Sequence, residues 1–193
     1  MRSERHEGFT LAELLIVVAI IGIVGAVAIP LLSFQNAKKL DVAAEEVGNA
    51  LRFAINEAGR TGAYILVDAK TAPGRLKVVT SNATGADLGP VNDPLTKRAL
   101  DIDIAGGAFS GPVSMAPRFM QGGTAYAQLL IGPACCTAGQ LQVFDGPSVN
   151  MGALQSRSGI VLSLGPPSVT GCFLSSWCVT IDEITGFVAI PQD

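Results

Sequence analysis

The sequence predicts an α+β fold in which a long N-terminal α-helix packs against a C-terminal head built on an antiparallel β-sheet. Three observations lead to this prediction. Residues 14–37 carry no charge, residues 40–58 repeat apolar side chains at three- and four-residue intervals, and residues 60–193 hold short β-rich runs separated by Gly and Pro. A one-sided helix and a sheet of this kind bury their apolar faces against each other, because neither can do so alone.

The first element is an apolar helix, expected at residues 9–32, with one acid, Glu13, near its start. Twenty-four uncharged residues follow this acid. At about 1.5 Å per residue they span roughly 36 Å, enough to cross a hydrocarbon core of about 30 Å, so we expect a transmembrane or filament-core helix. An acid inside such a segment costs roughly 2.5–3.5 kcal/mol and needs a positive partner. The alternative is that Glu13 reaches the lipid head groups.

The order of residues around this acid is distinctive. Gly8, Phe9 and Thr10 precede Glu13, and the apolar run continues to Pro30. This order resembles the class III signal of type IV pilins and type II secretion pseudopilins. The resemblance implies that residues 1–8 are a leader peptide, that a prepilin peptidase cuts after Gly8 and methylates the new amine of Phe9, and that Glu13 takes part in subunit assembly. It also implies a pilin-like fold.

Cleavage after Gly8 would give Glu13 a partner of opposite charge. The new α-amine of Phe9 has an ordinary pKa near 8 and is mostly protonated at neutral pH. Because positions four apart share one face of a helix, Phe9 and Glu13 can pair within one subunit. They can also pair between neighbouring subunits, as the resemblance implies, and the sequence leaves both arrangements open.

Three residues interrupt the apolar helix: Gly22, Gly25 and Pro30. Small residues allow neighbouring helices to approach closely, which explains the two glycines by packing alone. Pro30 removes a backbone hydrogen bond and kinks or loosens the preceding turn. The resemblance implies local melting of the helix between Gly22 and Pro30 in an assembled filament.

An amphipathic helix, expected at residues 33–59, continues into the head. If one helix runs from Phe9 to about Ala58, it is roughly 75 Å long, and Gly59 and Gly62 are predicted to end it. The apolar positions that define its buried face are Leu40, Ala43, Ala44, Val47, Ala50, Leu51, Ala54, Ile55 and Ala58.

The head, residues 60–193, is predicted to be all-β. Gly and Pro recur between its β-rich runs, which favours short strands that form one or two sheets packed on the amphipathic helix. Residues 82–96 show weak periodicity and are predicted to form a surface loop. The runs predicted as strands are residues 64–67, 76–79, 100–104, 125–131, 141–144, 160–164, 179–181 and 187–190.

Four cysteines lie in the head: Cys135, Cys136, Cys172 and Cys178. Their even number favours two disulfides and an oxidising compartment. Adjacent cysteines seldom bond each other, so we expect bridges from Cys135 and Cys136 to Cys172 and Cys178, with the connectivity open. Disulfides would place the head in the periplasm and the N-terminus of a single-pass inner-membrane chain in the cytoplasm.

Neither catalysis nor a cofactor is predicted for the mature chain. The one histidine, His6, lies in the expected leader, which leaves no imidazole for base catalysis or metal binding. Asp101 and Asp103 share a strand face and are candidate calcium ligands, but a solvated face is favoured. With 13 basic and 16 acidic residues, the composition makes nucleic acid an unlikely partner.

Two short motifs resemble H-class minor pseudopilins and related minor pilins: Ala-Ile-Asn-Glu-Ala at residues 54–58 and Thr-Gly-Phe-Val-Ala-Ile at residues 185–190. The sequence therefore predicts a minor subunit of a type IV pilus or type II secretion pseudopilus. The implied partners are other pilin subunits, the prepilin peptidase, the inner-membrane assembly platform and membrane lipid. The alternatives are a major pilin that forms the filament shaft and a single-pass, membrane-anchored periplasmic binding domain.

Overall fold

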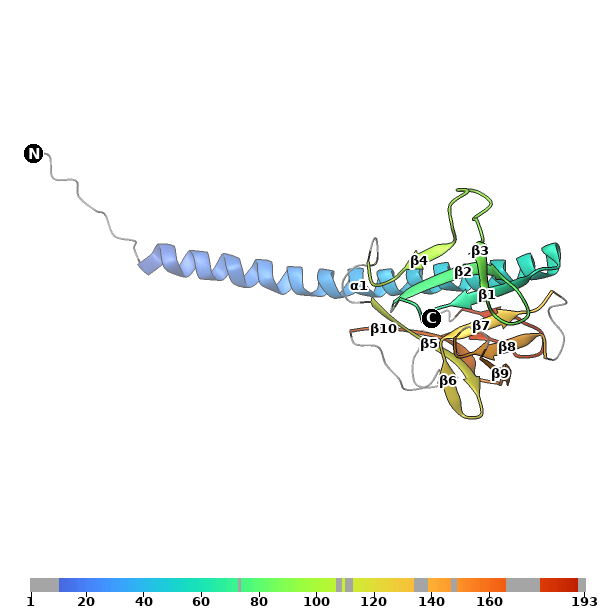
Figure 1. Ribbon diagram of the computed structural model, residues 1–193. Coiled ribbons are helices and arrows are strands. Elements are labelled where there is room, and N and C mark those ends of the chain that lie inside the picture. Colours follow the sequence, from blue (N-terminus) through green and yellow to red (C-terminus); the bar gives the residue numbers. More distant parts are fainter. Residues whose placement is uncertain are drawn as a thin grey trace, which may run out of the picture. The chain divides into compact units, whose positions relative to one another are not determined.

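The computed structural model describes residues 11–72, 74–106, 109, 113–133, 139–146, 149–165 and 178–190, without the side chains of residues 27–35. Within these residues the chain forms one helix and twelve strands (Figure 1). It divides into two compact units, Met1–Ala37 (the N-terminal unit) and Lys38–Asp193 (the head unit). The elements are α1 (Leu11–Thr61), β1 (Tyr64–Asp68), β2 (Arg75–Ser81), β3 (Asp87–Pro90), β4 (Asp101–Asp103), β5 (Val113–Gln121), β6 (Thr124–Tyr126), β7 (Gln128–Ile131), β8 (Leu141–Phe144), β9 (Asn150–Ala153), β10 (Ser158–Leu164), β11 (Cys178–Ile181) and β12 (Val188–Ala189).

Helix α1 is a single element of 51 residues, as the sequence predicted, and it remains helical through Gly22, Gly25 and Pro30. It ends where predicted at Gly62, whose φ of +67° is a left-handed conformation that favours glycine. The Gly62 N–H donates to the Ala58 carbonyl at 3.0 Å and so satisfies one of the last helical acceptors. Gly59, the other predicted stop, lies inside the helix.

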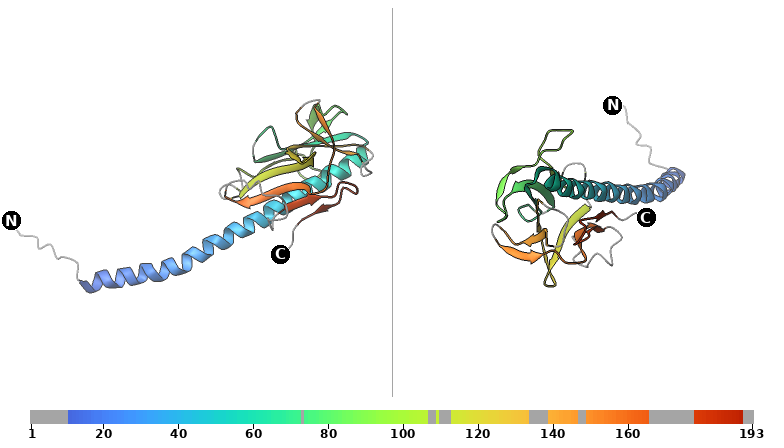
Figure 2. Two further views of the ribbon diagram at one scale, coloured as in Figure 1. Left: turned by 90° about the horizontal axis from the view of Figure 1, so that it is seen from below. Right: turned by 90° about the vertical axis from the view of Figure 1, so that its right-hand side faces the viewer.

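The strands of the head unit form two antiparallel sheets. The first has seven strands in the order β3-β2-β1-β7-β8-β9, with β4 paired to β2 beside β3. The second has five strands in the order β12-β11-β10-β5-β6. Figures 1 and 2 show the strands of both sheets gathered around the teal, C-terminal half of α1. The predicted α+β class and the antiparallel pairing are confirmed.

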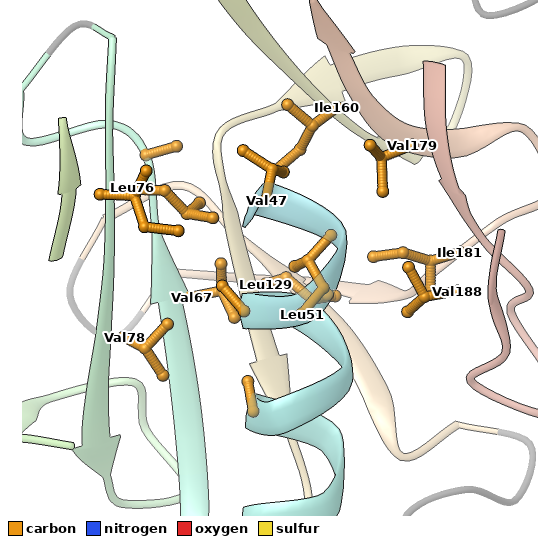
Figure 3. Packing of buried hydrophobic residues seen from close by; sticks show 14 of the residues in the cluster. Val47, Leu51, Val67, Leu76, Val78, Leu129, Ile160, Val179, Ile181 and Val188 are labelled. Atoms are coloured by element: carbon orange, nitrogen blue, oxygen red, sulfur yellow. The ribbon is translucent and has the colours of Figure 1, made fainter. Parts of the chain in front are cut away.

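The core of the head unit lies between α1 and the two sheets. Val47 and Leu51 of α1 are fully buried, and Figure 3 shows them between side chains of the first sheet and side chains of the second. All but one of the helix positions predicted to face the core are buried, and Ile55 is half-buried. The sheet residues labelled around Val47 and Leu51 are Val67, Leu76, Val78, Leu129, Ile160, Val179, Ile181 and Val188.

The last strand is held on α1 by two features of the helix. Arg52 donates to the Val188 carbonyl from Nη2 at 2.9 Å and from Nε at 3.3 Å. One turn earlier, Gly48 leaves room for Ile190, since a Cβ at Gly48 would lie 2.5 Å from Ile190 Cδ1. The Arg52 guanidinium and the lack of a side chain at Gly48 together allow β12 and Ile190 to pack against the helix.

Every run predicted as a strand contains one, but three strands were missed. The predicted loop 82–96 holds β3, an edge strand of Asp-Leu-Gly-Pro with none of the usual alternation. Strand β9 contains Gly152 and is also at an edge, and β5 contains Pro117. Gly and Pro obscure the period-two pattern on which strand prediction depends.

Another predicted run, residues 125–131, is divided at Ala127 into β6 and β7. The Ala127 carbonyl accepts from the Ala69 N–H at 2.9 Å, which continues the pairing of β7 with β1 by one residue. The chain thereby passes from the second sheet to the first at this residue.

Candidate functional site

The N-terminal unit presents an apolar surface that its own chain leaves exposed. Between Leu11 and Val24 the exposed fraction of the large apolar side chains runs from 48% to 81%. Because these residues are nearly consecutive, they face every direction around the helix. A helix that is apolar all round is normally buried in lipid or in a protein assembly. The residues are Leu11, Leu14, Leu15, Ile16, Val17, Val18, Ile20, Ile21, Ile23 and Val24.

Glu13 lies in the first turn of α1, is exposed, and is the one charged residue of the segment 11–37. An acid in the first turn interacts favourably with the helix dipole, by about 0.3–1 kcal/mol at an exposed position. The structure thus places the predicted assembly residue among exposed apolar side chains, at a helix end that already favours a negative charge. The predicted cleavage and methylation positions, Gly8 and Phe9, lie outside the described residues.

The glycines of α1 differ in what requires them. A Cβ built on Gly22 or Gly25 meets no atom within 4 Å, so packing within this chain does not account for either residue. Gly48, by contrast, is required by the close approach of Ile190. Contact with another helix at Gly22 and Gly25, bending there, and melting up to Pro30 all remain predictions.

Among the predicted disulfide candidates, Cys178 is buried on β11 and is disulfide-bonded. Cys135, Cys136 and Cys172 lie outside the described residues. The pairing of the four cysteines, and the count of two bridges, stays a prediction.

The acids weighed as calcium ligands bind groups of their own chain. Asp101 accepts from Arg75 Nη2 at 2.6 Å and from Arg75 Nε at 3.2 Å, and the Asp103 carboxylate accepts from the Gly106 N–H at 2.8 Å. In the described part of the chain, no group of three or more His, Cys, Asp or Glu residues is placed to hold a metal ion. Asp101 and Asp103 therefore act as local structural residues.

The sequence reasoning missed a groove of about 420 Å³ on the head unit, between α1 and the loop 93–98. This loop follows β3, and its residues 93–96 belong to the predicted surface loop 82–96. A sequence signal for the turn was present, because Asp and Pro at residues 93–94 favour a turn. The apolar lining of the groove is Val42, Phe53, Leu95, Leu100 and Ile102, and its acids are Glu45, Glu46 and Asp93.

Residues 5–29 match the family model described as the prokaryotic N-terminal methylation motif. The match supports the type IV pilin-like family. It includes Gly8, Phe9 and Glu13, and a motif of this kind implies processing by a prepilin peptidase and assembly with other pilin subunits. It covers none of the head, so the H-class minor pseudopilin assignment is not confirmed. Neither a curated protein nor a solved structure matches the chain.

The pilin-type motif points to a protein associated with a membrane or a pilus. Over the residues that the structure describes, no helix is both long enough and apolar enough to cross a membrane. The predicted transmembrane role of residues 9–32 is not confirmed.

Proposed function

We propose that this chain is a structural subunit of a type IV pilus or a type II secretion pseudopilus, assembled through its N-terminal helix after cleavage between Gly8 and Phe9. One observation carries the proposal: the methylation motif at residues 5–29 coincides with the segment of α1 whose apolar side chains remain exposed in the single chain. A signal for processing and a surface that requires cover thus occupy the same stretch.

Assembly then depends on the pairing of two charges. Cleavage creates a cationic amine on Phe9 beside the carboxylate of Glu13, and we assign their pairing to neighbouring subunits. In a low-dielectric filament core, an unpaired charge is costly, so the pair fixes the axial step between neighbouring helices. The apolar side chains from Leu11 to Val24 supply most of the area that assembly would bury.

Before assembly, we propose that residues 9–32 hold the subunit in the inner membrane, with the head in the periplasm. The 24 uncharged residues from 14 to 37 support this placement, and so does the disulfide at Cys178, since disulfides persist in oxidising compartments. The mature chain acts without catalysis in this proposal, because its only histidine, His6, is lost with the leader.

Within a filament, we propose the minor-subunit role, supported by the short motifs at residues 54–58 and 185–190. Both motifs belong to the head unit: the first lies in the last turns of α1, and the second contains β12. A count of subunits in sheared fibres tests this role. A minor subunit is scarce there, whereas a shaft subunit is the main component.

The deciding experiment is mass spectrometry of the N-terminus after expression with and without a prepilin peptidase. We expect a chain that begins at N-methylated Phe9 when the peptidase is present and a chain that retains residues 1–8 when it is absent. A chain that keeps its first eight residues in the presence of an active peptidase, while a known prepilin in the same cells is cleaved, refutes the proposal. That result would favour a membrane-anchored binding domain.

A further inference from the structure

The loop 93–98 is a rigid ridge on the head unit. The Asp93 carboxylate accepts from the N–H groups of Leu95 at 2.6 Å and Thr96 at 3.0 Å. The Asp93 backbone closes the turn, with its N–H donating to the Arg98 carbonyl at 2.8 Å and its carbonyl accepting from the Lys97 N–H at 2.9 Å. These bonds hold the loop even though Lys97 has a φ of +58°, a conformation that is uncommon for a residue with a side chain.

This rigid ridge displays an apolar side chain to solvent. Leu95 is 90% exposed, the most exposed large apolar side chain described on the head unit. Lys97 and Arg98 follow it and are also exposed. The loop is already held in one conformation, so it loses little conformational entropy on binding. Its aliphatic side chain and two cations are therefore preorganised for contact with another surface.

The groove beside the ridge has the opposite charge. Val42, 53% exposed, and half-buried Phe53 line it with apolar surface, while Glu45 and Glu46 bring two carboxylates from α1. Glu46 lines the groove, and partial desolvation raises the pKa of its carboxyl. A cation at this position would favour the charged form of Glu46.

The described part of the head unit offers no charge that pairs with these groups. Among the described residues, none of the side chains of Glu45, Glu46, Lys97 and Arg98 has an ion-pair or hydrogen-bond partner. Each head unit thus carries an apolar groove with two available carboxylates next to an apolar ridge with two available cations. Such a patch is complementary to a second copy of itself.

We propose that this face joins two copies of the chain, with the ridge of one copy (Leu95, Lys97 and Arg98) seated in the groove of the other (Val42, Glu45, Glu46 and Phe53). The contact is isologous, since the same patch supplies ridge and groove in both partners. Leu95 fills apolar volume and the cations meet the carboxylates of the α1 segment. The contact does not require cleavage at Gly8 and so is independent of the proposed filament role.

Site-directed cross-linking of the full-length chain in detergent tests the geometry. Two differently tagged copies, one carrying Leu95→Cys and the other Val42→Cys, are co-expressed in a host without prepilin peptidase and oxidised. The matched control replaces Val42→Cys with Leu164→Cys, which is exposed to a similar extent (47%) but does not line the groove. We expect a mixed-tag dimer for the ridge–groove pair at least about fivefold above the control, the margin of a contact worth roughly 1 kcal/mol. Equal yields overturn the proposal.

Charge reversal tests the recognition. Glu45→Lys with Glu46→Lys in one cross-linking copy, or Lys97→Glu with Arg98→Glu in the other, should lower the dimer yield about tenfold, as expected when exposed pairs become repulsive. Combining both reversed copies should restore it. Glu183→Lys, outside the groove, serves as the control and should leave the yield unchanged. Failure of the combined copies to restore the dimer overturns the proposal, whereas failure of Phe9 methylation overturns only the filament role.

Discussion

Leu51 and Leu15 occupy the same helix and differ in what covers them. Leu51 is completely buried between the two sheets, while Leu15 is 63% exposed. Replacing either residue by Ala removes the same atoms and changes helix propensity by the same small amount. Any difference between the two variants therefore reports burial alone. This pair tests whether the head unit folds around its part of α1 and leaves the apolar N-terminal part for other molecules.

The expected magnitudes are well separated. Leu51→Ala leaves a cavity in a closed core, which costs about 2–5 kcal/mol. For a protein of this size each kcal/mol shifts the melting temperature by about 2–4 °C, so we expect a fall of roughly 4–20 °C. Leu15→Ala removes a side chain that is already mostly exposed and should cost at most about 1 kcal/mol. Near-UV circular dichroism of the full chain in detergent, followed during heating, measures both changes.

Incorporation into fibres is the second measurement, and here Leu15→Ala is expected to have an effect. In cells with the assembly machinery, Leu15→Ala should reduce incorporation into fibres, because Leu15 belongs to the surface that assembly covers. The assigned core would be refuted if Leu51→Ala lowered the melting temperature by no more than the shift that corresponds to about 1 kcal/mol. A Leu15→Ala chain that enters fibres as efficiently as the parent would refute the role of the exposed surface.

Three further predictions follow from single contacts. Glu13→Gln should leave cleavage and head melting unchanged but lower the share of chain in sheared fibres by at least about tenfold, because removing one partner of a buried pair costs about 3–5 kcal/mol; parental incorporation would contradict the pairing. Gly48→Ala should destabilise the head by about 1 kcal/mol, because the clash with Ile190 outweighs the helix gain, and should stabilise it by about 1 kcal/mol in an Ile190→Ala background; an unchanged sign in urea unfolding would contradict the close contact. The hydrogen bond from Lys77 lowers the pKa of Asp87, so this pair contributes stability above the unfolded-state pKa of about 3.9 and loses it as the pH falls through the lower folded-state pKa. Asp87→Asn should therefore flatten the acid side of the stability–pH curve while costing at most about 1 kcal/mol at pH 7, since both side chains are exposed; a parental acid slope would contradict the assignment.

The helix was predictable because its signals are local. The three- and four-residue spacing of apolar side chains from Leu40 to Ala58 marked the buried face correctly, and Gly62 marked the end. Gly59 was misjudged as a stop, because a glycine inside a helix costs only about 1 kcal/mol and packing of the neighbouring turns outweighs it. The buried Ala58 one residue before it supplies such packing.

The strands were predictable only where burial is regular. Strand β8 was predicted with its observed bounds, and all four of its residues are buried or half-buried. Strand β5 was missed because Pro117 lies within it, although that residue pairs across the sheet with Ile160. A strand tolerates Pro where the side that lacks the N–H is not hydrogen-bonded to a neighbouring strand. Whether a strand has such a side depends on the order of strands in the sheet, which the local sequence does not show.

The groove beside the loop 93–98 could not be predicted, because it too depends on how distant strands pair. Glu45 and Glu46 lie far from Lys97 and Arg98 in the sequence, and no local pattern links the two pairs. They become one surface only because β3 and β4 both pair with β2 and so place the connecting loop beside α1. Long-range pairing, and not composition, sets these opposite charges next to each other.

The change of pattern near residue 37 has a physical meaning that the structure makes explicit. From Leu11 to Val24 the large apolar side chains lie all round α1 and are exposed; from Leu40 to Ala58 most apolar side chains lie on one face, which the sheets bury, and Val42 stays exposed. On each part of the helix, the faces that carry apolar side chains indicate the sides from which other groups must cover it. An apolar surface on one side of a helix can be buried by a sheet of the same chain, whereas an apolar surface on all sides is normally buried in lipid or among other helices. The exposed apolar side chains from Leu11 to Val24 therefore indicate neighbouring molecules independently of the methylation motif, and both features favour the proposed assembly.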